Sequence, residues 1–199
     1  MLHLQRKGAA NINLVTPTHF LPQILAALWL AIPEGLRLPM LWNSSGYEKV
    51  DSLQLLEGIV AIYLPDMKYS DDEHARIYSS APDYTGINRI AVAEMARQVG
   101  NLEADSDGMA VKGLIIRHLV LPNGVSGARD ILDWIGTNLG KGTHLSLMSQ
   151  YFPAGMASED TVIGRHLNMT EYDDAMDALE RVGLENGWVQ ELDQERGPV

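Results

Sequence analysis

Cysteine is absent from the 199 residues of this sequence. Without thiols, the chain itself can form no disulfide, no thiolate zinc site and no cysteine-ligated iron–sulfur cluster, and it has no cysteine nucleophile. The six histidines do not replace these groups, because none has the close helical spacing of the H-E-x-x-H zinc motif. Thiolate chemistry is therefore excluded for these 199 residues.

Long apolar runs and an excess of positive charge are also missing. The longest apolar candidate, Phe20–Ile32, is broken by Pro22, so it predicts a buried helix rather than a bilayer span of about 20 residues. The first eight residues lack the apolar core of a secretory signal. A net charge of -11 opposes general binding to nucleic acid or anionic membranes, although a local basic spot can still bind an anion. We expect a cytoplasmic protein that binds neither nucleic acid nor membrane.

The residues that are present, 46% of them apolar, predict one globular domain of alternating strands and helices. Strands are predicted at Ile12–Val15, Leu38–Trp42, Ile59–Leu64, Leu114–Leu121 and Leu145–Met148. Helices are predicted at Leu21–Ala31, Val50–Leu56, Glu73–Ser80, Ile87–Val99, Ala128–Leu139 and Glu171–Val182. This alternation indicates an α/β fold with a mostly parallel sheet, and both an open doubly wound sheet and part of a (β/α) barrel fit it.

Three local signals refine this outline. The acidic segment Leu102–Lys112 contains Asp-Gly and predicts a hairpin or excursion. Thr170 with Asp173 predicts a capping box at the start of the last helix. The polar residues after Glu191 predict a frayed tail.

Polar clusters follow every predicted strand. They are Thr16-Pro17-Thr18-His19, Asn43-Ser44-Ser45-Gly46-Tyr47, Pro65-Asp66-Met67-Lys68-Tyr69, Pro122-Asn123-Gly124 and Ser149-Gln150-Tyr151-Phe152-Pro153. Each alone fits ordinary caps and turns, with Thr18, for example, as the N-cap of the following helix. Together they favour a ligand crevice at the carboxyl edge of the sheet, where α/β folds bind their ligands.

Two pairs of charged residues stand out within these strands. Arg117 and His118 are adjacent in an apolar strand, so their side chains point to opposite faces and one of them should face the barrel interior or crevice. A buried guanidinium needs an anionic partner, from the protein or from a ligand. Asp66 and Lys68 are two residues apart on an extended segment, which predicts either a simple ion pair or a bracket for a zwitterionic ligand.

Several stretches resemble, in order along the chain, the radical-SAM proteins of the pyruvate formate-lyase-activating kind. They are Asn11-Ile12-Asn13-Leu14-Val15-Thr16-Pro17-Thr18-His19, Leu41-Trp42-Asn43-Ser44-Ser45-Gly46-Tyr47, Gly58-Ile59-Val60-Ala61-Ile62-Tyr63-Leu64-Pro65-Asp66-Met67-Lys68-Tyr69, Tyr78-Ser79-Ser80-Ala81-Pro82-Asp83-Tyr84, Ile116-Arg117-His118-Leu119-Val120-Leu121-Pro122 and Met148-Ser149-Gln150-Tyr151-Phe152-Pro153-Ala154. The resemblance implies a partial (β/α) barrel that binds S-adenosylmethionine along its strand ends. In that family a [4Fe–4S] cluster on a CxxxCxxC loop cleaves this cofactor to a 5′-deoxyadenosyl radical, which abstracts hydrogen from a partner protein or another substrate.

The resemblance also implies cofactor-binding residues. Thr16, Thr18 and His19 would lie beside the methionine amine and carboxylate, and Asn43, Ser44 and Asp66 would form a monovalent-cation site and further cofactor contacts. Asp66 and Lys68 would contact a carboxylate, Arg117 and His118 the ribose or carboxylate, and Gln150 and Tyr151 would line the crevice.

The chain departs from the family where the chemistry begins. The CxxxCxxC loop belongs upstream of Asn11, so the first βα unit is expected to be missing, with residues 1–8 resembling the end of its helix. Ala61 stands where an acidic residue is expected. We therefore expect an incomplete radical-SAM-type barrel over residues 1–192, a polar tail over residues 193–199, and no radical activity. An exposed sheet edge would favour self-association.

Three alternatives remain open. The chain could be a catalytically dead module that binds S-adenosylmethionine or another small zwitterion. It could be one subunit of a split enzyme that pairs with a complementary N-terminal chain or with a protein substrate. An unrelated phosphate-binding α/β enzyme would need a glycine-rich loop opening a helix, and we expect none at these strand ends.

Overall fold

The computed structural model describes residues 1–192 and contains one seven-stranded sheet with helices packed against it. The strands are β1 (Ile12–Val15), β2 (Met40–Ser44), β3 (Val60–Pro65), β4 (Glu103–Ala104), β5 (Ala110–Leu119), β6 (His144–Met148) and β7 (Gly187–Val189). The α-helices are α1 (Leu2–Arg6), α2 (Leu21–Ala31), α3 (Val50–Gln54), α4 (Asp72–Ser79), α5 (Tyr84–Val99), α6 (Ala128–Asn138) and α7 (Met169–Val182). Short 3-10 turns, η1 (Thr18–Phe20), η2 (Pro122–Gly124) and η3 (Gly155–Glu159), follow β1, β5 and β6.

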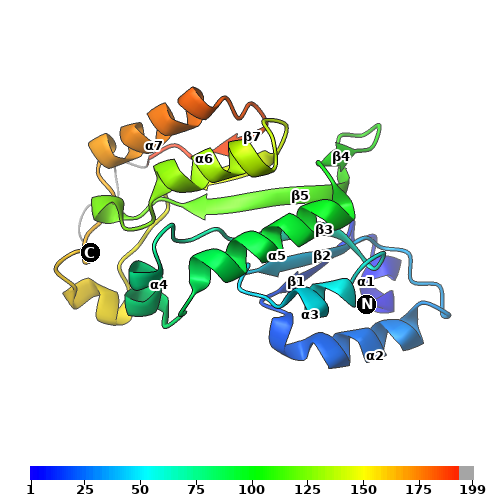
Figure 1. Ribbon diagram of the computed structural model, residues 1–199. Helices are drawn as coiled ribbons and strands as arrows, with labels where there is room; N and C mark the ends of the chain where they lie inside the picture. The colour runs from blue at the N-terminus through cyan, green and yellow to red at the C-terminus, as the bar shows by residue number, and fades with distance from the viewer. Residues whose placement is uncertain (193–199) are drawn as a thin grey trace.

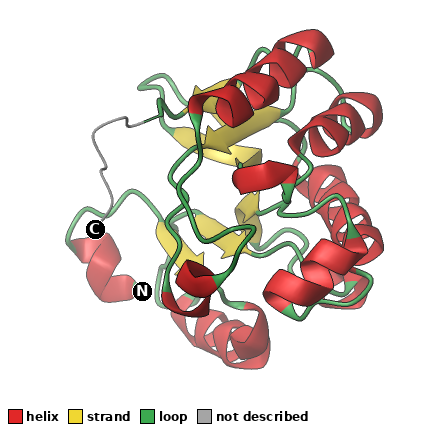
Figure 2. Ribbon diagram, turned by 90° about the vertical axis from the view of Figure 1, so that its left-hand side faces the viewer, coloured by secondary structure: helices red, strands yellow, loops and turns green. Residues whose placement is uncertain are grey.

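The strand order is β1-β2-β3-β5-β6-β7, so strands that follow one another along the chain are neighbours in the sheet. All five of these pairings are parallel. Figure 2 looks onto the carboxyl ends of the strands and shows α-helices following the sheet around one side. Sequential parallel strands with helical connections are the geometry of a (β/α) barrel. The expected α/β fold with a mostly parallel sheet, consistent with a partial barrel, is confirmed, and the doubly wound alternative is excluded.

The main core lies between the sheet and the helices. Buried side chains such as Trp42, Tyr63 and Ile116 point from the strands to meet Val92 and Leu132 on α5 and α6. A second cluster of buried side chains lies beyond the carboxyl ends of the strands, where α4 approaches the segment that follows β6 (Figure 1). This second cluster forms part of the candidate site.

Most predicted elements are present, with small differences at their ends. The hairpin predicted for Leu102–Lys112 is confirmed by the antiparallel pairing of β4 with β5. The second strand begins and ends two residues later than predicted, because Asn43 and Ser44 continue the ladder beside β3. Strand β7 was not predicted, since its three exposed residues form no apolar run.

The capping prediction for the last helix is wrong in its register. Asn168, not Thr170, is the N-cap of α7: its side chain accepts the amide hydrogen of Glu171, whose carboxylate in turn accepts the amide hydrogen of Asn168. The motif thus begins two residues earlier than predicted. The tail predicted for residues 193–199 lies outside the described residues, and the division into a barrel and a tail stays a prediction.

Candidate functional site

The parallel register brings the polar strand ends into one row along the carboxyl edge. The amide of Thr16 donates to the carbonyl of Asn43 at 2.8 Å, and the amide of Asp66 donates to the carbonyl of Ser44 at 2.9 Å. The amide of Met67 donates to the carbonyl of Arg117 at 2.9 Å. Residues far apart in the sequence therefore meet at this edge, as the strand pattern predicts.

Asp66 is the centre of an ion-pair cluster in this row. Its Oδ1 accepts a hydrogen bond from Arg117 Nε at 2.8 Å and lies 2.6 Å from Arg117 Nη2, and its Oδ2 lies 3.6 Å from Lys68 Nζ. The predicted ion pair of Asp66 with Lys68 is confirmed, and Arg117 joins it from the neighbouring strand. Two cations surround one carboxylate, so the cluster retains one positive charge in excess.

Helix α5 holds the backbone of this cluster in place. The Tyr84 hydroxyl accepts the amide hydrogen of Lys68 at 2.9 Å and itself lies 3.3 Å from the carbonyl of Asp66. Asn88 Nδ2 donates to the carbonyls of Asp66 and Gly46, at 2.9 and 3.2 Å. Burial raises the pKa of the Tyr84 hydroxyl, so it stays protonated as a donor. The cluster is therefore held at a fixed position before any ligand arrives.

A cavity of about 380 Å³ opens beside this cluster. Asp66, Lys68 and Arg117 line one end of it, and Gln150 and Tyr151 lie at the end of β6, where the resemblance implied a crevice. The remaining lining is mostly apolar or aromatic: Tyr69, Tyr78, Leu119, Leu121, Met148, Ala157 and Ile163. Its volume falls within the range of small-molecule sites, roughly 300 to 1,000 Å³. Among the implied site residues, five line this cavity.

The ends of β1 and β2 are built differently, around the buried side chain of Glu48. Its carboxylate accepts hydrogen bonds from Thr18 Oγ1 at 2.6 Å, Trp42 Nε1 at 2.9 Å and Ser44 Oγ at 2.8 Å. Thr18 is therefore not the N-cap of α2, which has no side-chain cap. The polar side chains here satisfy one another inside the protein.

The monovalent-cation site implied for Asn43, Ser44 and Asp66 stays a prediction, and the side chains of these residues do not support it. Side chains alternate along a strand, so Asn43 and Ser44 point to opposite faces of β2. Ser44 is buried against Glu48, and Asp66 is occupied by Arg117 and Lys68. The three side chains do not converge on one ion.

Thr16, His19 and Asn43 lie outside the cavity. Thr16 is exposed and has a positive φ of 51°, in the turn that leaves β1. The exposed His19 ring packs against Phe20, with their centroids 4.1 Å apart. Asn43 is half-buried and paired in register with Val15. None of the three contributes to the cavity lining.

His118 is placed on the opposite face of β5 from Arg117. It is completely buried, its Nδ1 lies 2.7 Å from the carbonyl oxygen of Met67, and its Nε2 has no partner among the described residues. Burial lowers its pKa to about 4, because the charged form would lose its hydration. The implied contact of His118 with a cofactor is therefore corrected: the residue is a neutral core histidine.

Four residues of this edge were missed from the sequence: Glu48, Tyr78, Tyr84 and Asn88. A Glu just after a turn and polar residues on a helix are ordinary surface patterns, and the resemblance gave Tyr78 and Tyr84 only as the ends of a matching stretch. The helical spacing of Tyr84 and Asn88, four residues apart, was the available signal, because it places both on one face of α5.

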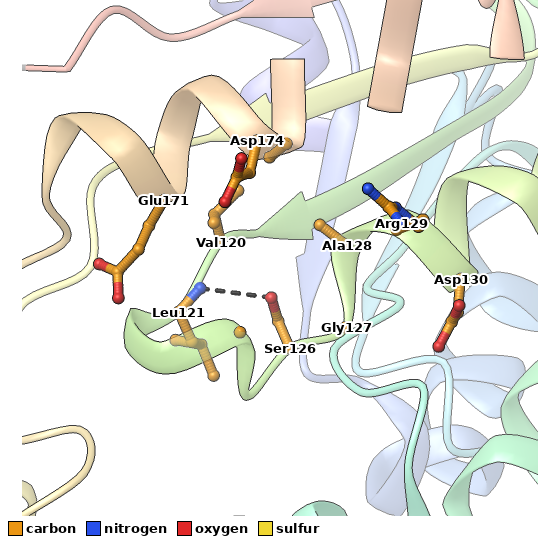
Figure 3. Close-up of a pocket in the computed structure, with 11 residues that line it drawn as sticks. Val120, Leu121, Ser126, Gly127, Ala128, Arg129, Asp130, Glu171 and Asp174 are labelled. Carbon is orange, nitrogen blue, oxygen red and sulfur yellow. Dashed lines mark hydrogen bonds between the residues drawn. The ribbon is translucent and has the colours of Figure 1, made fainter. Parts of the chain in front are cut away.

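A second cavity, of about 300 Å³, lies between the start of α6 and α7. It borders Gly124 and Gly127, so, contrary to expectation, a glycine-containing loop does open a helix at a strand end. Figure 3 shows Ser126 bonded to the Leu121 amide, with Glu171 and Asp174 reaching toward this loop from α7. These carboxylates oppose a phosphate, so this cavity does not support the phosphate-binding alternative.

Residues 1–192 contain no group of three or more His, Asp or Glu side chains placed to hold a metal ion. In the same part of the chain, no helix is long and apolar enough to cross a bilayer.

Comparisons with known proteins support the fold. No family model matches this chain. It is 29% identical over 187 residues to the uncharacterized protein MJ0674 of Methanocaldococcus jannaschii, an alignment that covers 91% of this chain and 49% of that protein. The chain thus spans about half the length of this relative.

A solved structure has the same fold as this chain. The chain superimposes on a domain of pyruvate-formate lyase-activating enzyme from Bacteroides vulgatus with a TM-score of 0.64. The match covers 92% of this chain and 99% of that domain, at 11% sequence identity. The two chains have one fold. At this identity the likeness extends to the fold alone.

Proposed function

We propose that this chain binds a small zwitterionic molecule at its carboxyl edge, with S-adenosylmethionine as the first candidate. The observation that carries the proposal is the cluster of Asp66, Lys68 and Arg117 in the lining of a cavity of about 380 Å³. A ligand carboxylate would bind Arg117 and Lys68, and a ligand ammonium would bind Asp66. The order of the radical-SAM-like motifs and the fold shared with an activating-enzyme domain both support this ligand.

We further propose that these 199 residues alone do not carry out radical chemistry. A [4Fe–4S] cluster needs thiolate ligands, and the chain has no cysteine. No described histidine or carboxylate cluster replaces them. The residues present thus fit the zwitterion and do not fit the cluster, which would have to come from another segment or another chain.

Calorimetric titration of the purified chain with S-adenosylmethionine tests the ligand. We expect saturable binding that weakens about tenfold or more in Asp66→Asn, because the ammonium loses its carboxylate partner. Methionine amide, which lacks the carboxylate, should bind more weakly than methionine. Equal affinity of the parent chain and Asp66→Asn for S-adenosylmethionine would refute the assignment.

Anaerobic reconstitution with iron and sulfide tests the absence of chemistry. We expect no 5′-deoxyadenosine above a protein-free control, since the reductive cleavage needs an electron from a low-potential cluster. Product formation by the isolated chain would overturn this part of the proposal.

A second function, as one subunit of a larger assembly, is favoured by the surface around β1 and α2. Within the described residues β1 pairs with β2 on one side only, and Val15 on this edge strand is 66% exposed. Helix α2 has no charged residue, and its Trp29 and Leu30 are 81% and 71% exposed. A helix that is apolar all round normally has a partner on each side.

Size-exclusion chromatography with light scattering tests this second function. We expect the parent chain to self-associate or to bind a complementary chain, and Trp29→Glu to weaken that association. A parent chain that stays monomeric and binds no such chain would contradict it.

A further inference from the structure

The cavity beside Arg117 has two chemically distinct ends. One end carries Asp66, Lys68 and Arg117 with one positive charge in excess. Arg117 uses Nε and Nη2 to bind Asp66, while its Nη1 makes no hydrogen bond within residues 1–192. Lys68 Nζ lies 3.6 Å from Asp66 Oδ2, and the Lys68 side chain is 43% exposed. These donors are available to an anionic group.

The other end of the cavity is a hydrophobic cluster that is not fully covered. Tyr69, Leu121 and Ile163 are buried members of this cluster. Tyr78, Leu119, Tyr151 and Ala157 pack against it but stay only partly buried, and all four line the cavity. An apolar group placed there would complete their burial, which is favourable by roughly 25 cal/mol per Å² of apolar surface.

The segment after β6 contributes Gln150, Tyr151, Ala157 and Ile163 to the lining of this cavity. The Tyr151 hydroxyl donates to the carbonyl of Ile163 at 2.9 Å, which joins the two ends of the segment. The side-chain hydroxyls of Tyr69 and Ser79 share a hydrogen bond of 2.9 Å. Asp160 also belongs to this segment, but it does not line the cavity. Its carboxylate accepts hydrogen bonds from the backbone amides of Val162 and Ile163. This segment therefore contributes no charged side chain to the lining of the cavity.

We propose that this cavity binds a small organic monoanion with an apolar or aromatic body: its carboxylate on Arg117 and Lys68, and its body between Tyr78, Tyr151 and Ile163. The inference rests on the proposed function only in using the same site: Arg117 and Lys68 are there assigned to the carboxylate of S-adenosylmethionine, so the two compounds would compete for this cavity. It names a second compound, distinct from S-adenosylmethionine, whose apolar body would lie against the hydrophobic part of the lining. A cavity of about 380 Å³ limits that compound to a small molecule.

Titration of the full chain with 3-phenylpropionate, its neutral amide and acetate tests the proposal. We expect saturable binding of the acid, with the amide about tenfold or more weaker because it loses the charge-assisted hydrogen bonds. Acetate should also bind about tenfold or more weakly, because it buries no ring. A series of straight-chain acids from six to ten carbons then measures the depth of the apolar end.

Matched variants locate the site. Arg117→Gln should weaken acid binding about tenfold or more, and Lys68→Gln should weaken it less, since Lys68 is the more exposed. Arg181→Gln, which removes an exposed arginine paired with Asp133 on α6, is the control and should leave binding unchanged. If Arg117→Gln fails to fold, two other measurements locate the acid in the cavity. One is the affinity of Lys68→Gln for the acid, and the other is the change in the NMR chemical shifts of Tyr78 and Tyr151 when the acid is added to the parent chain.

Equal binding of acid and amide would overturn the proposal, as would unchanged affinity in both cavity variants. No acid of the series binding tighter than about 10 mM would do the same. Binding of the acids without binding of S-adenosylmethionine would reject the proposed function and keep this inference. Binding of S-adenosylmethionine alone would do the reverse.

Discussion

The carboxyl edge of the sheet has two halves that look alike in sequence and differ in construction. At the ends of β1 and β2, the hydroxyls of Thr18 and Ser44 donate hydrogen bonds to the buried carboxylate of Glu48. At the ends of β3 and β5, Asp66 and Arg117 pair in the lining of a cavity. The first half buries its polar groups against one another, whereas the second leaves Lys68 and Arg117 partly exposed beside a cavity. A polar residue at a strand end therefore does not by itself indicate which of these two environments it occupies.

Gly46→Ala is the change expected to damage both halves, and it should have the largest effect. Gly46 has a φ of +68°, and a Cβ there would lie 2.3 Å from Asn88 Nδ2 and 2.6 Å from the Asp66 carbonyl oxygen. We expect a loss of about 4 kcal/mol in the free energy of unfolding, from backbone strain and overpacking together. Urea denaturation measures it.

Gly35→Ala is the matched control for Gly46→Ala. Its φ is +93°, but a Cβ there would meet nothing within 4 Å. It should cost only about 1 kcal/mol, the strain of the positive φ alone. Equal losses of unfolding free energy in Gly46→Ala and Gly35→Ala would show that the close approach of a Cβ at position 46 to Asn88 and Asp66 has no effect on stability.

Glu48→Ala is expected to damage the first half and spare the second. It leaves two buried donors, on Trp42 and Ser44, and one partly buried donor, on Thr18, without their acceptor, so we expect a loss of about 3 kcal/mol in the free energy of unfolding. Affinity for a cavity ligand should stay within about twofold of the parent under conditions where the variant is folded. Arg117→Gln should show the opposite pattern, with a large change in affinity and a smaller one in stability. If Glu48→Ala and Arg117→Gln changed stability and ligand affinity in the same proportions, the two halves of the edge would not differ in role.

The buried His118 is expected to make the free energy of unfolding depend on pH in the acid range. Its folded pKa of about 4 lies below its unfolded value of about 6.5, so the unfolded chain binds more protons between these pH values. The stability attributable to His118 is full above about pH 6.5, falls as the pH drops, and is about 3 kcal/mol lower near pH 4.

Denaturation of the parent chain, His118→Gln and His19→Gln at several pH values tests this dependence. His118→Gln should flatten the loss of stability between about pH 6.5 and pH 4. His19→Gln changes an exposed ring and should keep the parent's slope. A parent-like slope in His118→Gln would show that other groups cause the acid sensitivity.

The smallest expected effect concerns the capping box that joins α7 to the second half. Glu171 accepts the amide hydrogens of Asn123, after β5, and of Asn168, the N-cap. Its hydrogen bond to Arg165 and these two amides lower its pKa to about 2. Asn168→Ala should cost about 1 kcal/mol, and Thr170→Ala, at the N-cap of the predicted register, less than about 0.5 kcal/mol. A larger loss from Thr170→Ala would favour the predicted register.

Much of the fold could be predicted because it depends on patterns local in the sequence. The apolar segments at residues 21–31 and 12–15 predict α2 and β1 with their observed bounds, and β6 begins only one residue before the predicted Leu145. Strand β7 has no such pattern: Gly187–Val189 forms a strand only because the edge of β6 offers its backbone hydrogen-bonding partners. The start of α7 depends on which of several polar residues closes the cap, and propensity alone does not separate them.

The sequence by itself determined the alternation of strands and helices, the polar residues that follow the strands, and the lack of any thiolate ligand. It also determined that Arg117 and His118 face opposite sides, because side chains alternate along a strand. Only the tertiary structure decided which of the two faces the cavity. That choice follows from packing: helices cover the face of β5 that carries His118, while the other face meets Asp66, 51 residues earlier in the chain.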